Sequence, residues 1–202
     1  MTWSSRGAVV LTLAAISTVS LCAQGPREEP AEVRCPSVLG VGAHTATPFC
    51  DVHVQVDPAL GIQVVLPRRR GEATLSFNLH NRHIYSRQEE DEGRAYTRYV
   101  ASVAVATLDG DVVADAVVMS EFRTAVDLVD RVTGGAGPSG LKAIAPVGTE
   151  RVRVTVPANI DTVVIVGQSL DMVRLDGRET VTSPGRPIAI LSGATVSYRP
   201  RP

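Results

Sequence analysis

The sequence predicts an all-β protein, an antiparallel β-sandwich with at most one short helix. Three observations lead to this fold class: period-two alternation of apolar and polar residues, Asp-Gly pairs between apolar segments, and no sustained helical periodicity. Successive side chains of a strand point to opposite faces, so alternation indicates a strand with one buried and one wet face. Short strands joined by tight turns are typical of a sandwich.

Three segments show the alternation clearly. Residues 52–57 carry valine at every second position, residues 72–80 alternate Ala, Leu, Phe and Leu with polar residues, and residues 151–156 alternate valine with Arg or Thr. Each is predicted to be a strand whose apolar residues face the core.

Two Asp-Gly pairs predict hairpins. Asp109-Gly110 separates two apolar segments, and Asp176-Gly177 separates residues 171–175 from residues 178–182. A type I′ turn requires positive φ at both central residues, which Asp-Gly tolerates. Residues 119–130 fit either structure, because their apolar residues have both helical and strand spacing. That choice stays open.

The strands resemble those of exported immunoglobulin-like or jelly-roll-like sandwiches. The Cys–Trp–Cys pattern of immunoglobulin domains is absent, because the single tryptophan is Trp3. The resemblance therefore extends to the fold class alone and implies no site residues.

The first 23 residues have the layout of a secretory signal peptide. Arg6 precedes an uncharged apolar run, and cleavage is predicted after Ala23. The alternative is a lipoprotein signal in which Cys22 becomes an acylated N-terminus, although Leu21 stands where that signal prefers a small residue. No later apolar run is long enough to span a bilayer. We expect a secreted or periplasmic protein, and the arginine-rich composition suggests a bacterial source.

The mature chain is expected to have two parts. Residues 24–34 are polar, with two prolines and three glutamates, and predict a flexible leader. Residues 35–202 are expected to form a single exported β-sandwich domain.

Two cysteines remain after cleavage. Cys35 and Cys50 are predicted to form a disulfide, since paired cysteines in an oxidising compartment are usually oxidised. The alternative is a metal site in which these cysteines join His44 and His53, but the spacing fits no known zinc module. A second possible metal group adds the histidines of the LHNRH segment, His80 and His83, to the other two.

The charge balance gives no electrostatic reason to expect nucleic acid or an anionic membrane as a partner. The chain has 20 basic and 21 acidic residues, a net charge of −1, and loss of Arg6 makes it −1 − 1 = −2. A glycine-rich stretch carries Gly135, Gly137 and Gly140 in G-x-G-x-x-G spacing. Pro146 leaves too few residues for the helix that a dinucleotide site requires, so we expect a loop between strands and no cofactor.

No residue is nominated as catalytic, and two classes of function remain. The first is a non-catalytic exported module that binds or scaffolds an unknown protein or envelope component. The second is a small exported hydrolase or metal-dependent enzyme with dispersed site residues. The candidate contact surface for the first is a loop rich in tyrosine and charge, with Tyr85, Tyr96, Arg98 and Tyr99.

Overall fold

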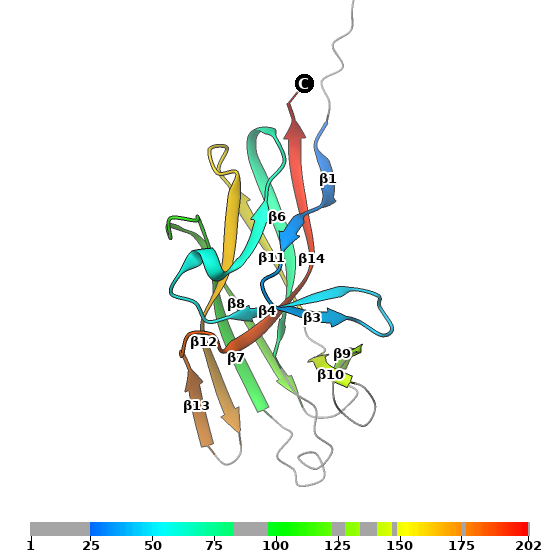
Figure 1. The fold of residues 1–202 in the computed structure, drawn as a ribbon, viewed down its shortest axis with the longest axis vertical. Helices are drawn as coiled ribbons and strands as arrows, with labels where there is room; N and C mark the ends of the chain where they lie inside the picture. The colour runs from blue at the N-terminus through cyan, green and yellow to red at the C-terminus, as the bar shows by residue number, and fades with distance from the viewer. Residues whose placement is uncertain are drawn as a thin grey trace, which may run out of the picture.

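The structure is a computed structural model that describes residues 25–82, 97–122, 128–133, 141–146, 149–174 and 177–201. Within these ranges the chain forms strands and one short 3₁₀ turn, η1 (Pro58–Leu60), and no α-helix. Two antiparallel sheets pack face to face (Figure 1). The predicted all-β sandwich is confirmed.

The first sheet has the strand order β11-β6-β14-β4-β3, and β1 pairs with β14. Its strands are β1 (Arg27–Pro30), β3 (Val38–Val41), β4 (Pro48–His53), β6 (Arg69–Asn81), β11 (Glu150–Val156) and β14 (Pro187–Pro200). The second sheet has the order β2-β5-β12-β7-β8, and β13 pairs with β12. Its strands are β2 (Glu32–Arg34), β5 (Ile62–Val65), β7 (Thr97–Ala106), β8 (Val112–Phe122), β12 (Thr162–Arg174) and β13 (Gly177–Val181).

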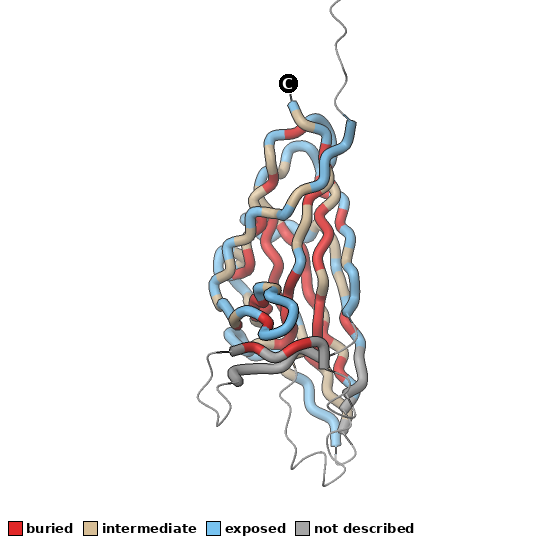
Figure 2. The backbone as a smooth tube through the Cα atoms, turned by 90° about the vertical axis from the view of Figure 1, so that its right-hand side faces the viewer, coloured by how far each residue is buried: buried red, intermediate tan, exposed pale blue. Residues whose placement is uncertain are grey.

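The core lies between the sheets, where red buried segments face each other in Figure 2. In β6 the predicted inward residues, from Ala73 to Leu79, are at most 2% exposed, and Phe77 is fully enclosed. Val52 and Val54 are buried as predicted, but Val56 is 83% exposed. Strand β4 ends at His53, so Val56 lies beyond the strand and the alternation does not determine whether its side chain is buried.

Both predicted hairpins are present, but the predicted type I′ turn is not found at Asp109-Gly110, because only the glycine of this pair has a positive φ. Strands β7 and β8 pair around Gly110, whose φ is +94°, and Thr107 N–H donates to the Asp111 carbonyl. Strands β12 and β13 pair with Arg174 opposite Gly177, so two residues connect them. Those two residues lie outside the described ranges.

The open segment 119–130 is resolved as strand wherever the structure describes it. Strand β8 continues to Phe122, and β9 (Leu128–Thr133) begins beyond residues 123–127, which lie outside the described ranges. The glycines at 134–140 also lie outside them. The segment that follows is β10 (Leu141–Pro146), which pairs with β9, so the helix of a dinucleotide site is not formed there.

Residues 24–34 were expected to be a flexible leader, and the structure corrects this for residues 27–34. Strand β1 pairs with β14 and β2 pairs with β5. Edge strands are held by backbone hydrogen bonds, which polar composition does not oppose. Ala31 and Val33 also pack partly against the core.

The Cys35–Cys50 disulfide is confirmed, with the two Cα atoms 5.9 Å apart. Cys35 follows β2 of the second sheet and Cys50 lies in β4 of the first, so the bond links the two sheets. None of the described helical residues forms a segment long and apolar enough to cross a membrane.

Candidate functional site

A hollow of about 500 Å³ lies near the end of the second sheet where β7, β12 and β13 extend beyond β4 (Figure 1). Its floor consists of two cross-strand pairs, Tyr99 with Met172 and Leu170 with Val181. Tyr99 and Leu170 are 6% and 4% exposed, whereas Met172 and Val181 are half-buried. The apolar inner face of the second sheet is thus partly uncovered, and we call this feature the Tyr99 hollow.

Charged residues surround this apolar floor. Arg82, directly after β6, donates from Nε to Asp51 Oδ1 of β4 at 2.7 Å. The side chains of Arg82 and Asp51 are only 18% and 9% exposed, so this ion pair is largely desolvated and fixes the arginine at the rim. Arg186 and Glu179 are exposed and also line the hollow.

Only part of the predicted contact loop lies within the described residues. Tyr85 and Tyr96 lie outside them. Tyr99 and Arg98 lie on strand β7 rather than on a loop, and Tyr99 forms part of the floor of the hollow. Arg98 is exposed on the neighbouring position, which faces the opposite side of the sheet.

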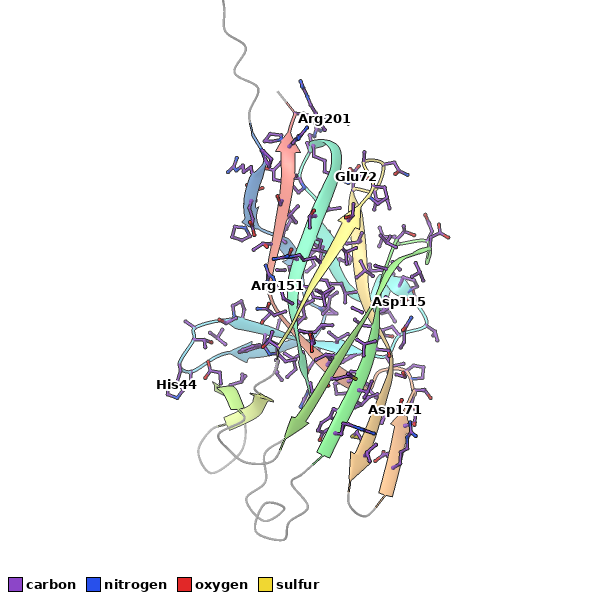
Figure 3. The ribbon with its side chains drawn as sticks, turned by 180° about the vertical axis from the view of Figure 1, so that it is seen from behind. His44, Glu72, Asp115, Arg151, Asp171 and Arg201 are labelled. Carbon is purple, nitrogen blue, oxygen red and sulfur yellow. A yellow bond between two sulfur atoms is a disulfide. The ribbon has the colours of Figure 1, made fainter. Side chains whose placement is uncertain are left out.

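Among the described residues, the alternative histidine groups are not assembled. His44 lies in the turn between β3 and β4, far from the core strands (Figure 3), while His53 ends β4 and His80 lies in β6. In the described ranges no three His, Cys, Asp or Glu residues are placed to hold a metal ion. His83 lies outside these ranges. Both cysteines of the first metal alternative are in the disulfide.

His80 instead belongs to a buried hydrogen-bonded group. Its Nε2 lies 2.8 Å from Ser192 Oγ and its Nδ1 lies 3.1 Å from Thr149 Oγ1. The ring also contacts Phe49 edge-on, with centroids 5.7 Å apart. Burial lowers the pKa of His80 to about 4, so the ring is neutral at pH 7.

This arrangement resembles a serine nucleophile beside a histidine base, and sequence reasoning did not find it, because the two residues are far apart in the chain. Two observations count against catalysis. Ser192 and His80 are only 4% and 3% exposed, which leaves little access for a substrate. The second ring nitrogen bonds a hydroxyl, where catalytic triads have a carboxylate that stabilises the imidazolium.

Sequence reasoning also missed Arg82, Met172, Val181 and Arg186 as members of one site. No local signal could have found them, because each is an ordinary strand or strand-end residue. They meet only because β13 folds back on β12 and β14 begins beside the end of β6.

No protein-family model matches the chain, and no curated protein matches it. Solved structures with some similarity come from infectious bursal disease virus. The VP2 subviral particle is 13% identical with a TM-score of 0.30, covering 93% of this chain and 38% of that chain. A chain in the structure of the Gx strain is 10% identical with a TM-score of 0.27, and the match covers 93% of this chain and 38% of that chain. The chain therefore spans little more than a third of these proteins, and scores this low carry no argument about function.

Proposed function

We propose that the protein is an exported, non-catalytic β-sandwich module that binds a protein or envelope component through the Tyr99 hollow. The observation that carries the proposal is the combination of an apolar floor with a charged rim. Recognition sites characteristically bury apolar surface at their centre and use a few polar groups at the edge for orientation.

The chemistry of the hollow fits binding better than catalysis. Arginine guanidinium groups remain protonated and cannot act as a general base. Glu179 is exposed, and the described lining residues give it no neighbouring nucleophile. The exposed Arg186 can bind a carboxylate while Met172 and Val181 receive an apolar group. We therefore expect a partner segment that carries an apolar side chain next to an acidic group.

The proposal of export rests on the disulfide and on the signal-like first 23 residues. Disulfides persist in oxidising compartments and are rare in the cytosol. Loops and sheet ends of exported sandwiches often carry binding surfaces.

Photo-crosslinking tests this site directly. A photoreactive amino acid at Met172 should yield a discrete adduct in an envelope extract, and the same group at Met119, which is 62% exposed on the outer side of β8, should not. Val181→Asp should abolish the adduct by placing a charge on the apolar floor. Val117→Asp, at an exposed outer position, is the matched control. Equal labelling at both methionine positions in folded protein would contradict the proposal.

The hydrolase alternative is favoured by one observation, the Ser192–His80 hydrogen bond. A fluorophosphonate probe reacts with activated serines, and we expect no labelling of the folded protein at pH 7. Labelling of Ser192 that disappears in His80→Gln would overturn the non-catalytic proposal in favour of an enzyme.

A further inference from the structure

A second hollow, of about 290 Å³, lies on the outer face of the first sheet at the end where the C-terminus leaves β14. Its polar lining consists of two arginines, Arg70 of β6 and Arg199 of β14, the acid Glu72, and the hydroxyl residues Thr74, Ser197 and Tyr198. We call it the Arg70–Arg199 hollow. It is separate from the Tyr99 hollow and shares no residue with it.

The two arginines are directly opposite each other in the register of β6 and β14. Like charges at directly opposed positions destabilise a sheet. Glu72 also lines the hollow, yet within the described part of the chain it forms no ion pair with either arginine. Glu28 of β1, opposite Ser197, accepts a hydrogen bond from Thr195 instead, so within the described part of the chain neither guanidinium group is held in an ion pair.

Hydroxyl groups complete the polar lining. Thr74 and Ser197 are cross-strand partners in the same two strands as the arginines. Guanidinium groups offer several N–H donors in a planar fork, and hydroxyls add O–H donors. Two arginines with two hydroxyls supply donors from several directions, which suits a tetrahedral anion with four oxygens.

Neighbouring arginines strengthen the positive potential of this end. Arg201 donates from Nε to the Arg69 carbonyl at 2.7 Å, which holds its charge beside β6, and Figure 3 shows Arg201 and Glu72 at the same end of the sandwich. Arg69 itself is 3% exposed, and its closest carboxylate oxygen, on Asp161, is 3.9 Å from Nη1. This ion pair is long and its Asp161 side chain is 90% exposed, so it neutralises the buried charge only weakly.

We propose that the Arg70–Arg199 hollow binds a phosphate or sulfate group. A bound anion removes the repulsion between the opposed arginines and gains charge-assisted hydrogen bonds from both. The group belongs either to a soluble oxyanion or to the headgroup of an anionic lipid.

Inorganic phosphate is the first probe. Calorimetric titration of the purified protein with phosphate, at ionic strength held constant with chloride, should show saturable binding. Arg70→Gln and Arg199→Gln should each weaken it by about tenfold, as expected for loss of one charge-assisted contact. Glu72→Gln should tighten it several-fold. The matched control is Arg153→Gln, an exposed arginine of β11 opposite Ser76, which should leave the affinity unchanged.

Vesicles distinguish the two sources of the anion. If the ligand is a lipid headgroup, the protein should sediment with phosphatidylglycerol vesicles and not with phosphatidylcholine vesicles, and Arg199→Gln should reduce this while Arg153→Gln should not. Saturable phosphate binding without vesicle binding assigns the site to a soluble oxyanion. Absence of both, or an equal loss in Arg153→Gln, would overturn the proposal. Far-ultraviolet circular dichroism of each variant checks that the sandwich is intact.

Discussion

At the scale of single residues, the burial of His80 makes the free energy of unfolding depend on pH. The folded state holds its pKa at about 4 because the ring is buried between Ser192 and Thr149, whereas the ordinary value is 6.5. Between these two values the unfolded chain binds more protons than the folded chain. The stabilisation from a neutral His80 is therefore complete above about pH 6.5. It is lost as the pH falls through about 4.

Urea unfolding at pH 7 and at pH 4 measures this effect. The His80 contribution to the free energy of unfolding should decrease by about 3 kcal/mol between these pH values. Carboxylates also titrate in this range, so the relevant quantity is the difference between the natural protein and His80→Gln. The same pH dependence in both proteins would show that His80 is not the group responsible.

Gly42 is a second residue with a defined role, in the turn between β3 and β4. The Asp130 carboxylate of β9 accepts hydrogen bonds from Thr45 N at 2.8 Å and from Thr45 Oγ1 at 2.7 Å. A Cβ on Gly42 would overlap Asp130 Oδ2 and crowd Thr45 Oγ1. This close approach, and not an unusual φ, requires glycine here.

We expect Gly42→Ala to lower the free energy of unfolding by about 1–3 kcal/mol, the usual cost of forcing atoms into a packed site. Thermal unfolding provides the measurement. Gly177→Ala is the control, because a Cβ there meets no atom within 4 Å. A Gly42→Ala protein as stable as the control would mean that the turn can shift away from Asp130.

At the scale of elements, the disulfide connects the residue after β2 to β4 and thereby links the two sheets. The sequence separation of its cysteines is 15. A loop of this size corresponds to about 3 kcal/mol in the chain-entropy description of disulfide stabilisation.

The double variant Cys35→Ser with Cys50→Ser should therefore lose about 3 kcal/mol of unfolding free energy. Chemical denaturation of this variant beside the oxidised natural protein measures the loss. Reduction of the natural protein with dithiothreitol should produce a similar shift of the midpoint. No shift in either experiment would show that strand pairing alone holds β2 and β4.

At the scale of the whole molecule, charge is distributed unevenly. The net charge of −1 gives no reason to expect an anionic partner, yet Arg70, Arg199 and Arg201 gather at one end of the sandwich. Composition averages over the surface, whereas binding depends on the local potential. The phosphate proposal therefore does not conflict with the overall charge.

Processing is a prediction for the whole chain. We expect the mature protein to begin at Gln24 and to be recovered outside the cytoplasm, because the first 23 residues have the layout of a signal peptide. Intact-mass measurement of protein from a bacterial host tests this. A species that begins at Cys22 and carries acyl mass would instead identify a lipoprotein.

The sequence by itself determined the fold class, the inward residues of β6, both hairpins and the disulfide. These features depend on local patterns or on the number of cysteines. Side-chain alternation has a period of two residues, and a hairpin turn involves about four consecutive residues. The expectation of a flexible leader was wrong for residues 27–34, because strand pairing uses backbone N–H and C=O groups and therefore does not require apolar side chains.

Only the tertiary structure decided which residues meet. The two proposed binding sites, and the hydrogen bond between His80 and Ser192, join strands that lie far apart in the chain. Strand order and register bring these side chains together, and neither is encoded in the spacing of any one segment. Tyr99 shows the difference, because the sequence marks it as an aromatic residue near a charged loop, whereas its place on β7 beside Met172 makes it part of an apolar floor.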